Sequence, residues 1–126
     1  MLKNKLYFTT FSLLLSINLS AGSLGSLLFH GNCITCHHET KDISAPSIIS
    51  VQDNYRRAFP KKKDFVDYMS KWVTHPNAEG SLMLDAIKKY ELMPLLGYEK
   101  STLKIISAYI YDTDFTKEHE GHKDRE

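Results

Sequence analysis

The sequence predicts an all-α fold of about four to five short helices. Apolar residues recur at intervals of three and four in several separate stretches, which is the spacing of one helix face. Prolines and a few glycines stand between these stretches and mark where helices end. No stretch alternates apolar and polar residues convincingly, as a half-buried strand would. The chain has 126 residues, of which 42% are apolar and 25% charged, as in ordinary globular domains.

The first 21 residues have the layout of a secretory signal peptide. Two lysines near the start precede an uncharged apolar run from Leu6 to Leu19, and small residues follow it. This run is shorter than the roughly 20 residues that a spanning helix needs. We therefore expect cleavage near Ala21 and export to the periplasm. An uncleaved N-terminal anchor is the alternative, and membrane contact is expected only in that case.

The rest of the chain is interpreted as one domain, residues 22–115, followed by a polar tail, residues 116–126. The first expected helix covers residues 22–32, because apolar side chains one turn apart define a face: Leu24, Leu27 and Leu28. A polar loop over residues 38–46 comes next, and Pro46 makes a helix through this loop unfavourable.

Four more helices are expected, each with apolar residues on one face. They cover residues 47–59, 61–74, 81–91 and 99–112. Pro60 and Pro76 separate the first three of these, and Met93-Pro94 ends the third. A turn containing Gly97 then leads into the last helix, whose face is set by Leu103, Ile106, Tyr109 and Ile110.

One short motif carries the chemistry, Cys33-Ile34-Thr35-Cys36-His37. This C-x-x-C-H pattern is the attachment motif of c-type haem. Two thiols three positions apart on a helical turn can each add to one vinyl group of the same porphyrin. The histidine that follows then lies under the iron as an axial ligand. Covalent attachment suits an exported protein, because the cofactor cannot diffuse away.

Three other interpretations of the two cysteines stay open at this point. A thioredoxin-like dithiol also uses C-x-x-C but needs a βαβ context, and none is visible. A structural zinc ion needs four ligands, and Cys33, Cys36, His37 and His38 are crowded along the chain. A plain disulfide is possible in an exported protein, but it gives His37 no role.

With its flanking residues, the motif resembles the opening of the small class I cytochromes c. Gly25 and Phe29 before the motif, and Tyr109 in the last helix, are similar to the residues of the family's helix crossing. The resemblance implies a cytochrome c-like fold around one covalently bound haem c, with Gly25 allowing a close crossing. It also implies that the carbonyl of Pro46 accepts a hydrogen bond from the His37 ring. This chain has Ala45 where the family usually has glycine.

The resemblance also implies a distal ligand for the iron. Met93-Pro94, followed by a turn and the final helix, is similar to the family's methionine loop, so that His37 and Met93 would hold the iron. Met69 and Met83 lie within expected helices and are interpreted as core residues. His75 is the best imidazole rival for the distal position.

Two further features of the sequence can each be interpreted in two ways. Trp72 either donates its indole N–H to a haem propionate or packs in the core. The basic cluster Lys61-Lys62-Lys63, with two nearby arginines, is a docking patch for an acidic redox partner or, as we favour, a solvated helix start.

The expected function is one-electron transfer between periplasmic redox partners by a monohaem c-type cytochrome. An iron with two axial ligands has no open position for a substrate, so we do not expect an enzyme. The alternatives are a haem-bearing subunit of an oxidising enzyme complex, for example for sulfur compounds, and a haem-based sensor in which Met93 is not bound. The near-zero net charge of +1 gives no ground for nucleic-acid binding.

Overall fold

The computed structural model describes residues 20–117. This part of the chain contains five α-helices and no strand. The prediction of an all-α fold is therefore confirmed. Most of the expected signal peptide and of the polar tail, residues 1–19 and 118–126, lies outside the described part. None of the helices within residues 20–117 has the length and apolar character needed to cross a bilayer. The helices are α1 (Ala21–Asn32), α2 (Ile48–Ala58), α3 (Lys62–Thr74), α4 (Leu84–Tyr90) and α5 (Lys100–Asp112).

The helix boundaries follow the side chains that satisfy the terminal backbone groups. Ser47 caps α2 by accepting the N–H of Ser50 at 3.4 Å. The fourth helix was expected from residue 81, and this boundary is wrong. The Ser81 hydroxyl instead accepts the backbone N–H of Met83 at 3.0 Å, which favours a turn over a helix at this point. The helix α4 consequently begins only at Leu84.

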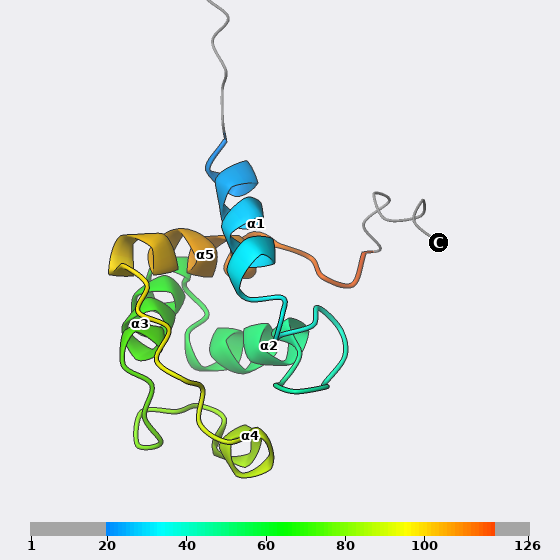
Figure 1. The fold of residues 1–126 in the computed structure, drawn as a ribbon. Coiled ribbons are helices and arrows are strands. Elements are labelled where there is room, and N and C mark those ends of the chain that lie inside the picture. Colours follow the sequence, from blue (N-terminus) through cyan, green and yellow to red (C-terminus); the bar gives the residue numbers. More distant parts are fainter. Residues whose placement is uncertain (1–19, 118–126) are drawn as a thin grey trace, which may run out of the picture.

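The helices α1 and α5 cross (Figure 1), and the distances at Gly25 place it at the crossing. A Cβ atom on Gly25 would lie 2.6 Å from the Cβ of Tyr109 and 3.2 Å from the carbonyl oxygen of Ile105. Phe29 is fully buried beside the crossing, with its ring centroid 5.6 Å from that of Tyr109. The close crossing implied by the family resemblance is confirmed. Leu27, expected on the apolar face, is instead 69% exposed, because Gly25 and Phe29 form the buried face.

Replacing Gly25 by alanine is expected to destabilise the protein by about 1–3 kcal/mol, the usual cost of overpacking a close contact. The new methyl group would meet the Cβ of Tyr109 and the carbonyl oxygen of Ile105, which cannot move aside as a flexible side-chain end can. Denaturant unfolding followed by circular dichroism measures the change. Gly31→Ala is the matched control: the same helix has open space there. Because alanine has a higher helix propensity than glycine, the Gly31→Ala variant should be as stable as the wild type or slightly more stable. Equal losses of stability in both variants would contradict a close crossing at Gly25.

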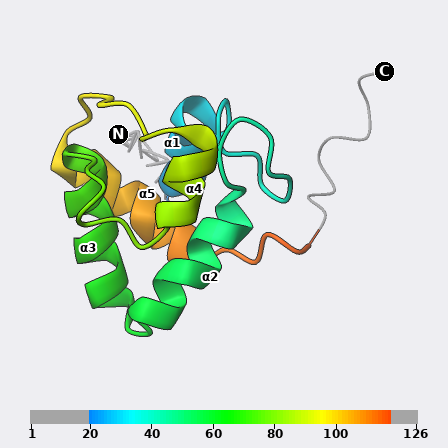
Figure 2. The same cartoon turned by 90° about the horizontal axis from the view of Figure 1, so that it is seen from below.

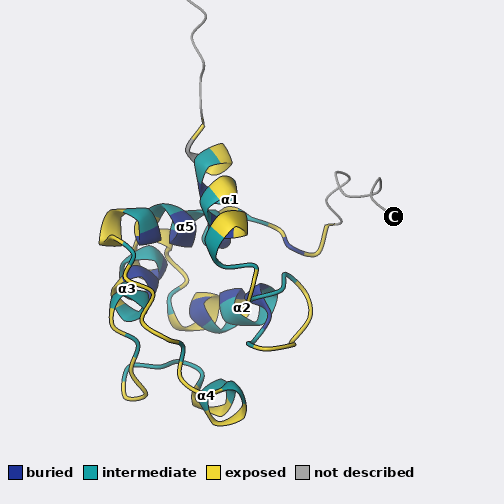
Figure 3. Ribbon diagram, viewed as in Figure 1, coloured by how far each residue is buried: buried dark blue, intermediate teal, exposed yellow. Residues whose placement is uncertain are grey.

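The core lies where α3 and α5 pack together, with α2 beside them (Figure 3). Phe65 from α3 is fully buried, and Ile106 and Ile110 from α5 are almost so. Gln52, buried on α2, donates through Nε2 to the carbonyl oxygens of Ile110 and Thr113, the latter at 2.7 Å. This amide satisfies the end of α5 and ties it to α2.

The short helix α4 stands apart from this core. It packs against none of the other four helices and contributes no buried residue. Figure 2 shows α4 lying across the molecule between α2 and α3, and Figure 1 shows it on the far side from α1 and α5. The space between α4 and the rest of the protein is therefore the place to examine for a site.

Candidate cofactor site

A largely apolar cavity separates α4 from the remaining helices. It encloses about 240 Å³ and is partly open to solvent, and all five helices contribute lining residues. This volume lies near the lower end of the range of common ligand pockets, roughly 300–1000 Å³. Glu91 is the one charged side chain among the lining residues, apart from the titratable Cys33, Cys36, His37 and tyrosines.

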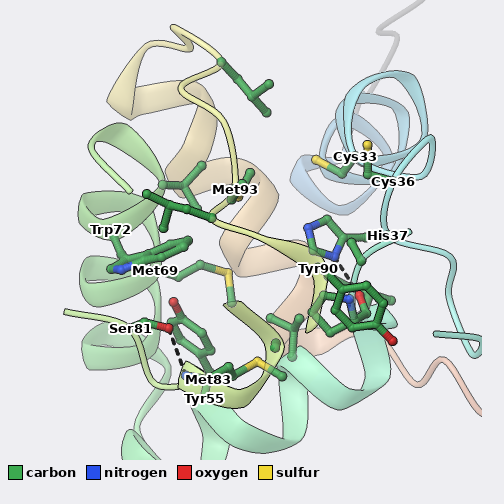
Figure 4. A pocket seen from close by; sticks show the side chains of 18 of the residues that line it. Cys33, Cys36, His37, Tyr55, Met69, Trp72, Ser81, Met83, Tyr90 and Met93 are labelled. Carbon is green, nitrogen blue, oxygen red and sulfur yellow. Dashed lines mark hydrogen bonds between the residues drawn. The ribbon is translucent and has the colours of Figure 1, made fainter. Parts of the chain in front are cut away.

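Cys33 and Cys36 lie together at one end of this cavity (Figure 4). Cys33 ends α1, and its carbonyl oxygen accepts the backbone N–H groups of Cys36 at 3.2 Å and of His37 at 2.9 Å. Both cysteines are free thiols. This single turn places both sulfur atoms and the imidazole beside one cavity.

The thiol of Cys33 is a poor candidate for dithiol redox chemistry. Burial, together with the neighbouring Cys36, raises its pKa to about 11, so it stays protonated at neutral pH. Attacking thiols of dithiol oxidoreductases have a lowered pKa instead. Within residues 20–117 there is also no strand to supply a βαβ unit, and no group of three or more His, Cys, Asp or Glu side chains that could hold a metal ion.

His37 is held in one orientation by the loop that follows it. Its Nδ1 lies 2.7 Å from the carbonyl oxygen of Pro46, which can only accept, so Nδ1 is the donor and, in the neutral imidazole, Nε2 carries the lone pair. The hydrogen bond implied by the family resemblance is present, and Ala45 does not prevent it. No group in the described part of the chain hydrogen-bonds Nε2, which leaves this nitrogen free to bind a metal.

The loop that carries Pro46 is itself well anchored. Its two ends are joined by a backbone hydrogen bond from Ile48 to the carbonyl oxygen of His38, at 2.9 Å. Asp42 accepts the N–H of Ser47 at 2.6 Å, and this bond lowers the pKa of the Asp42 carboxyl. The position of the Pro46 carbonyl is thus fixed from both sides.

Met93 reaches the same cavity from the irregular segment between α4 and α5. Residues with positive φ mark the two ends of this segment, Glu91 at 72° and Gly97 at 73°. Tyr98 donates its hydroxyl to the side-chain oxygen of Asn32 at 2.9 Å, which pins the segment to the end of α1. The structure therefore brings Met93 together with Cys33, Cys36 and His37.

The rival residues for the distal position are distributed differently. His75 is exposed at the end of α3 and does not line the cavity. Met69 is 4% exposed, as expected of a core residue, and its side chain also extends into the cavity (Figure 4). Met83, expected within a helix, is the N-cap residue of α4 and lines the cavity too.

Trp72 lines the cavity, but its indole N–H is already used. It donates to the carbonyl oxygen of Asn77 at 3.0 Å, so donation to a propionate would require this bond to break. The sequence patterns do not predict the hydroxyl groups at the cavity, which belong to five of the lining residues: Ser44, Tyr55, Ser81, Tyr90 and Ser107. The Tyr90 oxygen is buried without a partner among the described residues. Helical periodicity places such residues on an apolar face but does not reveal an unsatisfied hydroxyl.

The basic cluster is largely engaged in local contacts. Lys62 pairs with Asp112 at 2.5 Å and Lys63 with Asp67 at 2.8 Å. Arg56 donates to the carbonyl oxygen of Tyr111. These partners favour the interpretation as a solvated helix start over a docking patch.

Comparisons of the chain with protein-family models, with curated proteins and with solved structures find no match. The fold and the site define an all-α protein whose C-x-x-C-H turn lies at one end of a largely apolar cavity.

Proposed function

We propose that this protein is a monohaem c-type cytochrome that carries single electrons between periplasmic redox partners. Cys33 and Cys36 hold one haem c covalently, His37 is its proximal ligand and Met93 its distal ligand. The hydrogen bond between His37 Nδ1 and the Pro46 carbonyl carries the proposal, since it turns Nε2 away from the protein acceptor, beside two free thiols and a largely apolar cavity.

The residues around the cavity fit such a group. When bound, the haem supplies the one-electron couple of its iron. The Pro46 carbonyl orients the imidazole and increases its basicity as a ligand. The thioether of Met93 favours the reduced state more than a second imidazole would. Apolar walls such as Leu103 and Ile106 exclude water and keep the local dielectric constant low.

Covalent attachment is the direct test. The chain is expressed in a bacterial host that exports and matures c-type cytochromes. We expect its mass to increase by that of one haem, and this increase should persist after the protein is denatured. Cys33→Ala and Cys36→Ala should each leave only one thioether link, whereas the double variant should lose covalent haem. Ser44→Ala, which also changes a residue at the cavity wall, is the control and should keep both links. A wild-type chain without added mass would contradict the proposal.

A haem-based sensor is the alternative that ligand binding can separate from the carrier. If Met93 occupies the distal position, carbon monoxide should bind the ferrous protein weakly or not at all at neutral pH. The Met93→Ala variant, which opens that position, should bind carbon monoxide readily. Visible spectra recorded during titration with the gas measure both, and ready binding by the wild type would favour the sensor.

A further inference from the structure

Two hydroxyl groups without acceptors lie at the end of the cavity away from the cysteines. Tyr55 projects from α2 into the cavity and is only 5% exposed (Figure 4). Within residues 20–117, no group hydrogen-bonds its hydroxyl. Ser81 also lines this end; its oxygen accepts the Met83 N–H at 3.0 Å, but its own proton has no acceptor in the same part of the chain.

The segment before Ser81 is held by a set of hydrogen bonds. The Trp72 indole donates to the carbonyl oxygen of Asn77, and the side-chain oxygen of Asn77 accepts the Gly80 N–H at 2.7 Å. Tyr68 donates its hydroxyl to the Gly80 carbonyl oxygen at 2.8 Å. These bonds fix the backbone next to Ser81, so its hydroxyl is presented to the cavity from a set position.

The hydroxyls of the buried Tyr55 and the half-buried Ser81 face the cavity without a protein acceptor, so a ligand that supplies one gains their hydrogen bonds. The strongest partner for an O–H donor is a carboxylate oxygen. No lysine or arginine lines the cavity, so these neutral hydroxyls are the donors available at this end. A haem attached through its two vinyl groups to Cys33 and Cys36 would carry its propionates on the edge away from these cysteines, and Figure 4 shows Tyr55 and Ser81 at that end of the cavity.

We propose that Tyr55 and Ser81 bind a propionate carboxylate of the haem, an inference that rests on the proposed function. Both hydroxyls donate to the carboxylate. Trp72 and Tyr68 are then positioning residues that hold the Ser81 segment. Trp72 keeps its bond to Asn77 and does not donate to the propionate itself.

The test uses the haem-loaded protein with carbon-13 in the propionate carboxylates. Redox-induced infrared difference spectra report the stretching bands of these carboxylates. We expect Tyr55→Phe and Ser81→Ala each to shift the labelled bands toward those of a carboxylate with fewer hydrogen bonds. Tyr111→Phe is the matched control, because the Tyr111 hydroxyl donates to the Pro60 carbonyl outside the cavity; it should leave the bands unchanged.

The outcomes separate this inference from the function on which it rests. Covalent haem in the wild type with identical bands in Tyr55→Phe, Ser81→Ala and Tyr111→Phe would overturn the carboxylate site and leave the cytochrome proposal standing. A wild type without covalent haem would overturn both. If Tyr55→Phe does not accumulate, Ser81→Ala alone decides, since it removes one small hydroxyl from a half-buried loop residue.

Discussion

Replacing Met93 by histidine is expected to abolish sulfur ligation and to lower the reduction potential of the protein. Ferric haem with a thioether ligand has a weak band in the far red, which should be present in the wild type and absent from Met93→His. Imidazole stabilises ferric iron more than a thioether does. The potential should fall by on the order of 0.1 V or more, within the roughly 0.8 V that axial ligands span.

The segment that carries Met93 makes this substitution informative. Its path is set by the backbone at Glu91 and Gly97 and by the hydrogen bond from Tyr98 to Asn32, none of which involves the Met93 side chain. A histidine at this position is therefore presented to the same side of the cavity. Loss of the band then reports on the ligand and not on an unfolded segment.

Two other methionines supply matched controls for the same measurement. Met69 and Met83 also line the cavity, and leucine has nearly the volume of methionine. Met69→Leu and Met83→Leu should both keep the far-red band and a potential close to that of the wild type. A band that persists in Met93→His and disappears in Met69→Leu would transfer the distal role to Met69.

The sequence predicts most of the helical framework because its signals are local. Prolines at 60 and 76 and the apolar spacing in the last helix place α2, α3 and α5 to within a few residues. The start of α4 is not predictable in this way, because the bond from the Met83 N–H to Ser81 competes with the helix. Leu27 is exposed because α1 packs against α5 through the face that contains Gly25. The spacing of apolar residues alone cannot show this.

The residues of the candidate site also differ in how far the sequence predicts their location. Cys33, Cys36 and His37 are consecutive or one turn apart, so their shared location follows from one motif. Tyr55 and Ser81 come from distant parts of the chain and meet the cavity only through the packing of α2 and the loop after α3. Trp72 was weighed as a propionate donor because its N–H needs an acceptor, but a nearby carbonyl already provides one.

The double variant Cys33→Ala/Cys36→Ala, prepared without haem, is expected to lose the structure of α4. A helix of seven residues is too short to be stable by itself in water. The helix α4 packs against no other helix, and its apolar side chains Ala86, Ile87 and Tyr90 face the cavity. Its stability must therefore come from whatever fills that cavity.

Amide hydrogen exchange read by mass spectrometry tests this dependence. In the haem-loaded wild type, peptides covering residues 84–90 should be protected, whereas in the double variant their opening free energy should fall to about 0 kcal/mol, as in frayed segments. Peptides from α3 and α5 should keep more protection, because these two helices pack against each other. Phe65 of α3 lies in the same buried core as Ile106 and Ile110 of α5. The single variant Cys36→Ala, which keeps one thioether link, is the control and should resemble the wild type. Equal protection of residues 84–90 with and without haem would mean that α4 is stable by itself, and the cavity would then be a preformed pocket instead of one completed by its cofactor.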